Sequence, residues 1–123
     1  MNKKLAVILG FICLTIGSTN VYANHSEHYV FEYETGDVYD VTFTDSSVMW
    51  KGLEGSDKGQ SETDFIKTKK ISNNVEVIQW NEKNGSFITV IFDRTNLDIV
   101  SSIKTNDGSW LMSGKASYLT PAT

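Results

Sequence analysis

The chain has 123 residues, with 15 acidic and 11 basic side chains and a formal net charge of −4. This length supports a single domain with one modest core and leaves no room for a second. The acidic balance argues against a nucleic-acid partner, because contact with a phosphate backbone depends on Lys and Arg.

The first 23 residues are expected to form a cleavable secretory signal. Lys3 and Lys4 come before an apolar run from Leu5 to Ile16, and Val21 and Ala23 occupy the two positions at which signal peptidase prefers small side chains. The apolar run is shorter than the roughly 20 residues of a membrane-spanning helix. We therefore expect cleavage after Ala23, export to the periplasm or the medium, and no integral membrane segment in the mature chain. An uncleaved membrane anchor is the alternative.

Cleavage would leave one domain at residues 24–123 with a more acidic surface. It removes Lys3 and Lys4, so the number of basic residues falls from 11 to 9 while all 15 acidic residues remain, and the net charge becomes −6. The single cysteine, Cys13, leaves with the signal. The mature domain therefore has no disulfide or thiol chemistry, and its stability must come from packing and a closed sheet.

From residue 29 onward, apolar and polar side chains alternate with period two, which predicts β-strands rather than helices. Eight strands are expected, at residues 29–33, 39–43, 48–50, 65–66, 75–81, 87–93, 97–104 and 110–119. Asn84-Gly85 and Asp107-Gly108 are turn signals between them, since these residue types tolerate positive φ. Residues 52–63 form the longest irregular stretch, which we expect to be either a loop at the mouth of a barrel or a solvated connection.

Strands joined by short turns predict an all-β, antiparallel, up-and-down barrel. Closure removes the two exposed edges that an open meander would have. A barrel of about eight strands is just wide enough to hold side chains or one small ligand. A sandwich of two sheets is the alternative.

The alternation also predicts which side chains face the interior. In the strand at residues 75–81 the large Trp80 points inward, which places Glu82 on the same face. An inward carboxylate beside tyrosine hydroxyls is a candidate site, because burial raises the pKa of a carboxyl group and such groups gather at functional sites. Alternatively, Glu82 reaches solvent at the end of its strand and the tyrosines fill the core. The residues expected to face inward are Tyr29, Phe31, Tyr33, Tyr39, Val41, Phe43, Ile78, Trp80 and Glu82.

Two segments carry recognisable motifs. The segment from Val77 to Val90 contains Trp80, Glu82 and Gly85, and the segment from Phe31 to Tyr39 contains three aromatic residues. The first resembles the Trp-x-Glu-x-x-Gly hairpin of the MoaF-like family and of the phenolic acid decarboxylases. The second resembles the aromatic-x-Tyr-x-x-Gly-x-x-Tyr start of the same proteins. The resemblance covers most of the mature domain and implies a small lipocalin-like barrel.

The decarboxylase resemblance implies an enzyme in which tyrosines and an arginine hold a substrate carboxylate and a glutamate acts as the acid. By position, Tyr33, Tyr39 and Glu82 match the tyrosines and the glutamate. Phe31 stands where that family has a further catalytic tyrosine, and the segment from Lys58 to Gln60 lacks the family's arginine. Lysine is a poor substitute for a bidentate guanidinium, so the MoaF-like comparison fits better.

We expect an exported barrel that holds a small apolar or aromatic ligand at its mouth, since ligand pockets are mostly apolar with a few placed polar groups. The first alternative is an enzyme of the phenolic acid decarboxylase type, in which Glu82 acts with Tyr33 and Tyr39. The second is a packed barrel that acts through its outer surface. The expected ligand-binding residues are Tyr33, Tyr39, Trp50, Trp80 and Glu82.

No cofactor or metal is expected. The only histidines, His25 and His28, lie at the start of the mature chain, where we expect a polar tail rather than a strand. Two histidines without a third fixed ligand do not make a structural zinc site. The expected partner is the small-molecule ligand, and oligomerisation stays open.

Overall fold

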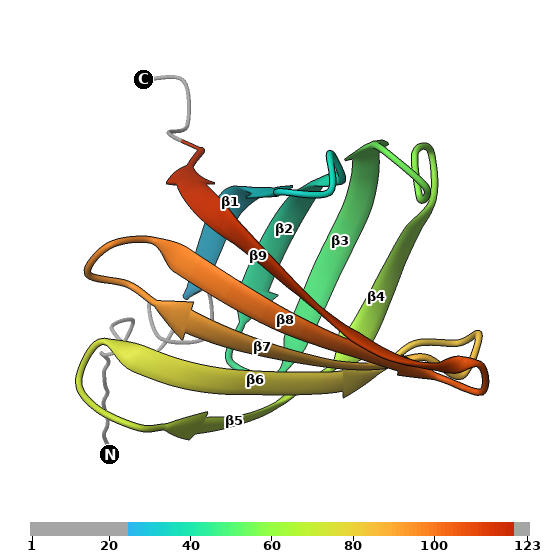
Figure 1. The fold of residues 1–123 in the computed structure, drawn as a ribbon. Helices are drawn as coiled ribbons and strands as arrows, with labels where there is room; N and C mark the ends of the chain where they lie inside the picture. The colour runs from blue at the N-terminus through green and yellow to red at the C-terminus, as the bar shows by residue number, and fades with distance from the viewer. Residues whose placement is uncertain (1–24, 120–123) are drawn as a thin grey trace, which may run out of the picture.

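The computed structural model describes residues 25–119, so the expected signal at residues 1–23 and its cleavage site lie outside the described residues. The described chain is an all-β fold of nine strands (Figure 1). It contains no helix with the length and hydrophobicity needed to cross a membrane. The strands are β1 (Ser26–Tyr33), β2 (Val38–Thr44), β3 (Ser47–Glu54), β4 (Ser61–Phe65), β5 (Lys67–Lys70), β6 (Val75–Asn81), β7 (Phe87–Asp93), β8 (Asp98–Thr105) and β9 (Gly108–Tyr118).

All neighbouring strands are antiparallel, in the order β4-β3-β2-β1-β9-β8-β7-β6-β5. The first and last strands pair with each other, with Phe31 opposite Ala116. The two edge strands, β4 and β5, are consecutive in the chain and are separated only by Ile66. The sheet curls so that β4 contacts β6, which makes a nearly closed barrel (Figure 1). The expected all-β antiparallel barrel is therefore confirmed.

Strand boundaries differ from the expectation between residues 52 and 70. The loop expected at residues 52–63 is confined to residues 55–60, because β3 continues to Glu54 and β4 begins at Ser61. The sequence of β4 conceals the strand, since four of its five residues are polar and only Asp64 is buried. The segment expected at residues 65–66 is the junction between two strands, so the barrel has nine strands rather than about eight.

The inward face predicted from the alternation forms the core. Phe92 of β7 packs edge-on against Tyr29 and Phe31, with ring centroids 4.9 Å and 5.7 Å apart. Buried aromatic rings of this kind contribute much of the energy of a small core. This aromatic centre fills the middle of the barrel, and a hollow lies toward each end. Of the residues expected inside, Tyr29, Phe31, Val41, Phe43, Ile78 and Trp80 are buried, and Tyr33 and Tyr39 are partly buried against them.

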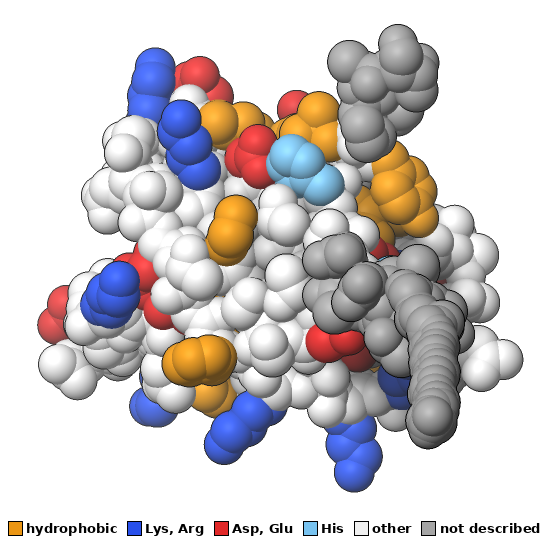
Figure 2. All heavy atoms as spheres, turned by 180° about the vertical axis from the view of Figure 1, so that it is seen from behind, with side chains coloured by type: hydrophobic (Ala, Val, Ile, Leu, Met, Phe, Trp, Pro, Cys, Tyr) orange, Lys and Arg blue, Asp and Glu red, His pale blue; other side chains and the backbone are white. Residues whose placement is uncertain are grey.

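The outer surface is mixed in character. Figure 2 shows the molecule from behind the view of Figure 1, and the hydrophobic side chains of this face form separate groups between charged and polar ones. Phe65 of β4 is the most exposed large hydrophobic residue of the described chain, at 87%. The described residues visible on this face thus form no continuous apolar surface.

Candidate ligand-binding cavity

A cavity of about 230 Å³, here called the end cavity, lies at the end of the barrel where β1, β6 and β8 end. Strands β8 and β9 contribute four residues to its lining, Ser101 and Ile103 from β8 and Trp110 and Met112 from β9. These four residues were not among those predicted to face the cavity, although the same period-two alternation in β8 and β9 could have found them. The lining contains all five residues predicted to bind a ligand: Tyr33, Tyr39, Trp50, Trp80 and Glu82.

Edge-to-face contacts connect three of the aromatic residues. The ring centroids of Tyr33 and Tyr39 are 6.0 Å apart with planes at 83°, and those of Tyr39 and Trp50 are 5.9 Å apart at 84°. This T-shaped geometry is favourable for aromatic pairs, and contacts between neighbouring strands stabilise a sheet. The packing of β1, β2 and β3 therefore fixes this aromatic wall.

The loop at residues 55–60 is held against the same end. The Gly52 N–H donates to the Gln60 carbonyl at 2.8 Å, and the Gly59 N–H donates to the Gly52 carbonyl at 2.9 Å. A Cβ at Gly52 would collide with the carbonyl oxygen of Asp57, so this close approach requires glycine. Because Asp57 lines the end cavity, the loop lies at the mouth of the barrel, the first of the two expectations for this stretch.

The two candidate tyrosine hydroxyls bond to groups other than Glu82. The Tyr39 hydroxyl donates to Asp57 Oδ2 at 2.5 Å, and the oxygens of the Tyr33 and Ser101 hydroxyls are 2.7 Å apart. Burial raises the pKa of Tyr33 to about 12. Burial, together with the hydrogen bond to Asp57, also raises the pKa of Tyr39. Both hydroxyls therefore stay protonated at neutral pH and are suited to hydrogen bonding rather than to proton abstraction.

Glu82 is the group of the end cavity that titrates near neutral pH. Burial raises its pKa to about 7, and the hydrogen bond from Trp80 opposes the shift. Three neighbouring carboxylates reinforce the shift, those of Glu62, Asp57 and Asp64. The Trp80 indole N–H donates to Glu82 Oε2 at 3.2 Å. Glu82 thus lies on the inward face, as the alternation predicts, and it is bonded to the indole of its own strand.

Asp64 is a buried carboxylate that was not among the predicted site residues. It is only 8% exposed, and neither Asp64 Oδ2 nor Trp50 Nε1 has a hydrogen-bond partner among residues 25–119. Burial and the neighbouring Glu62 carboxylate raise the pKa of Asp64 to about 6. No apolar alternation marks β4, so the sequence carries no signal for its inward face.

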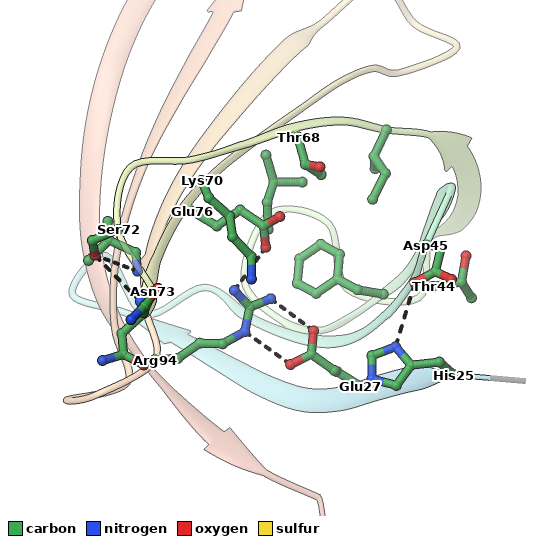
Figure 3. A pocket seen from close by; sticks show the side chains of 15 residues that line it. His25, Glu27, Thr44, Asp45, Thr68, Lys70, Ser72, Asn73, Glu76 and Arg94 are labelled. Atoms are coloured by element: carbon green, nitrogen blue, oxygen red, sulfur yellow. Dashed lines mark hydrogen bonds and ion pairs between the residues drawn. The ribbon is translucent and has the colours of Figure 1, made fainter. Parts of the chain in front are cut away.

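A second hollow, of about 400 Å³, lies where β1 begins and β7 ends, and is here called the Arg94 hollow (Figure 3). Arg94 lies between two carboxylates, with Nε and Nη2 donating to Glu27 at 3.0 and 2.8 Å and Nη1 donating to Glu76 at 2.8 Å. Burial opposes ionisation of Glu27, but hydrogen bonds from Arg94 and Tyr29 outweigh it and lower the pKa of Glu27. All three guanidinium nitrogens are therefore engaged within the fold.

The position of Arg94 bears on the decarboxylase alternative. Arg94 is the chain's only arginine, and it lies at the opposite end of the barrel from the candidate tyrosines. Lys58, in the segment that matches the family's arginine, pairs instead with Glu54 at 3.8 Å. Among the described residues, no Lys, Arg or His lines the end cavity. The described lining thus lacks the cation that would hold a substrate carboxylate.

One of the two histidines is placed differently from the expectation, since His25 precedes the first strand but His28 does not. His28 lies within β1 and not in a tail, because the strand begins at Ser26. His28 Nε2 is 2.5 Å from Asp40 Oδ1, and His25 Nδ1 is 3.6 Å from Asp45 Oδ1. Within residues 25–119, no group of three or more His, Cys, Asp or Glu side chains is arranged to hold a metal ion.

Together, the strands and the lining define a small antiparallel β-barrel with an aromatic and acidic cavity at one end. A family model described as MoaF-like matches residues 25–117, and the chain belongs to the MoaF-like family. The resemblance of the hairpin from Trp80 to Gly85 to the MoaF-like family is thereby confirmed.

A solved structure shares the fold. A protein from Burkholderia vietnamiensis, described as a candidate β-lactamase, superposes with a TM-score of 0.71 at 10% sequence identity, covering 76% of this chain and 92% of that chain. At this identity the similarity shows the fold alone. The comparison with curated proteins gives no match.

Proposed function

We propose that this MoaF-like barrel is an exported protein that binds one small ligand with an apolar or aromatic group in the end cavity. The observation that carries the proposal is the convergence of aromatic rings from β1, β2, β3, β6 and β9 on one cavity of about 230 Å³. Ligand pockets typically combine such a lining with a few polar groups that orient the ligand. Glu82, Asp57 and Ser101 are polar groups of this kind.

The export part of the proposal rests on the sequence of residues 1–23. Amino-terminal sequencing of the protein recovered from fractionated cells tests it. We expect the protein outside the cytoplasm to begin at Asn24. A cytoplasmic protein that retains Met1 to Ala23 would contradict export.

A second candidate function is acid–base catalysis by Glu82. A pKa of about 7 suits a group that takes up or gives a proton near neutral pH. The decarboxylase form of this alternative has less support, because the Tyr33 and Tyr39 hydroxyls bond elsewhere and Arg94 lies at the other end. Action through the outer surface has less support on the face shown in Figure 2, where hydrophobic groups are scattered.

A thermal-shift screen of the protein purified after expression of the full chain tests ligand binding. A ligand that binds only the folded state raises the Tm by mass action. The panel contains small phenols, aromatic acids, aromatic alcohols and aromatic amines. We expect at least one of these classes to raise the Tm of the wild-type protein, and a panel without any shift would contradict the proposal.

Two variants locate the binding. Trp80→Leu removes an aromatic wall of the end cavity, and we expect affinity to fall about tenfold, the loss of about 1.4 kcal/mol of aromatic contact. Phe65→Leu is the matched control, because Phe65 is 87% exposed on β4 and does not line the cavity. Equal loss in both variants would count against the cavity as the binding site. Turnover of the bound compound that stops in Glu82→Gln would instead favour the catalytic candidate.

A further inference from the structure

The end cavity has acidic side chains and, within the described residues, no basic ones. Asp37, Asp57 and Glu82 line it. Glu62 and Asp64 lie close enough to influence Glu82 as well. Negative charge therefore accumulates at this end of the barrel, and no basic side chain of the described chain lines the cavity itself.

The three lining carboxylates differ in how many hydrogen bonds they already accept from other residues of the protein. Asp37 accepts hydrogen bonds from the Thr35 hydroxyl and from both the N–H and the hydroxyl of Ser56, which tie the turn after β1 to the loop at residues 55–60. Asp57 and Glu82 each accept one side-chain hydrogen bond, from Tyr39 and Trp80 respectively. An ionised carboxylate can accept about four hydrogen bonds. Asp57 and Glu82 thus keep acceptor capacity for a ligand, whereas Asp37 serves the fold.

Aromatic rings lie directly beside these two carboxylates. The Trp80 indole N–H is 3.2 Å from Glu82 Oε2, and the Tyr39 hydroxyl is 2.5 Å from Asp57 Oδ2. Both hydrogen bonds leave from the edges of the rings, so the carboxylates would hold a protonated nitrogen and the rings beside them would contact the apolar part of the same ligand.

We propose that the ligand of the end cavity is a small organic amine, bound in its protonated form with its nitrogen against Glu82 and Asp57 and its apolar part against the aromatic rings. This inference rests on the proposed function and names the chemical class of its ligand. A carboxylate or phosphate ligand would add negative charge to a lining with three acidic side chains and no described cation. A protonated amine instead supplies the missing counter-charge.

Isothermal titration calorimetry with three compounds of the same ring and similar size tests whether tight binding requires a positive charge on the ligand. The compounds are benzylamine, benzyl alcohol and benzoate, and the protein is that purified after expression of the full chain. At pH 8, above the pKa of about 7 of Glu82, we expect benzylamine to bind at least about tenfold more tightly than benzyl alcohol, as for a charge-assisted hydrogen bond, and benzoate to bind most weakly.

Two glutamate variants test whether Glu82 is the residue that binds the amine. Glu82→Gln should lower the affinity for benzylamine about tenfold and change the affinity for benzyl alcohol by less than about twofold, because only the charged interaction is lost. Glu32→Gln, at an exposed glutamate of β1, is the matched control and should change neither compound. Equal losses in Glu82→Gln and Glu32→Gln would overturn the role of Glu82.

The outcomes separate this inference from the proposed function. Benzyl alcohol or benzoate binding as tightly as benzylamine would overturn the cationic class and leave ligand binding in place. Failure of all three compounds, with a positive thermal-shift screen on neutral or anionic compounds, would also overturn the cationic class. Failure of all three together with a negative screen would overturn the proposed function itself.

Discussion

The two ends of this barrel are both hollow and both contain partly buried carboxylates, but only one end provides these carboxylates with a cation. In the Arg94 hollow, Glu27 and Glu76 share one guanidinium, and their side chains are only 27% and 16% exposed. In the end cavity, the described lining offers Glu82 no cation. The pKa of Glu27 is lowered and that of Glu82 is raised to about 7, although burial opposes ionisation of both. The presence or absence of a counter-ion thus decides the sign of the shift.

This difference separates an end whose charges stabilise the fold from the end at which we propose ligand binding. At the Arg94 hollow the charges satisfy one another, and Arg94 also lies over the Phe92 ring at 4.8 Å from its centroid. That arrangement joins β1, β6 and the turn after β7. At the end cavity the carboxylates keep hydrogen-bond acceptor capacity that other residues of the protein do not use, and this capacity is open to a ligand. Three substitutions test this contrast.

The largest expected effect is at the Arg94 hollow. Replacing Arg94 with Met should lower the free energy of unfolding by about 3 kcal/mol, because it leaves two partly buried carboxylates without their counter-ion. Urea denaturation measures the change. The control is Lys115→Met, which breaks the ion pair with Asp98 at 2.6 Å between side chains that are 64% and 47% exposed. That exposed pair should contribute less than about 1 kcal/mol, and equal losses in the two variants would remove the contrast between buried and exposed pairs.

An intermediate effect is expected at Gly52. A Cβ in Gly52→Ala would collide with the backbone of Asp57 and displace the loop at residues 55–60. We expect a loss of about 2 kcal/mol in unfolding free energy, as for other overpacked sites, together with weaker ligand binding at the end cavity. Met49→Ala, at a 49% exposed residue of the same strand, should cost less than about 0.5 kcal/mol and leave binding unchanged. Unchanged binding in Gly52→Ala would show that the loop does not shape the site.

The smallest effect concerns the pH dependence of Glu82. Its pKa is about 7 in the folded protein and 4.5 in the reference state, so the folded state holds the proton more tightly. This contribution to stability is complete below pH 4.5 and is lost as the pH rises through about 7. Glu82→Gln should therefore flatten the fall in Tm across that range and raise the Tm at pH 8 by about 2 to 4 °C.

The control for this profile is Glu32→Gln, whose Tm should follow that of the wild-type protein at every pH. The other carboxylates that act on Glu82 are Asp57, Glu62 and Asp64, and they remain in the variant. Asp64, with its own raised pKa of about 6, should preserve part of the slope at lower pH. A Glu82→Gln profile parallel to that of the wild type would show that Glu82 is ionised at neutral pH without cost.

Much of the barrel and of the candidate site could be predicted from the sequence. Alternation with period two depends only on neighbouring residues, so it predicted that Trp80 and Glu82 share one inward face. The same alternation predicted the inward-facing tyrosines. The Asn84-Gly85 turn is equally local, and the structure has Gly85 at φ 94° with its N–H donating to the Glu82 carbonyl at 2.9 Å. The expected export depends on residues outside the described range and stays a prediction.

Other features depended on tertiary structure because they join residues that are far apart in the sequence. The β4 strand has a polar sequence and exists through its pairing with β3, which buries Asp64 without any local signal. The pairing of β1 with β9 closes the barrel, and Arg94 meets Glu27 across 67 positions of the chain. The sequence by itself therefore determined which side chains face the interior in the strands with a clear alternation, because that follows from backbone geometry. Only the tertiary structure decided which charges are balanced, because a counter-ion is set by the strands that come together.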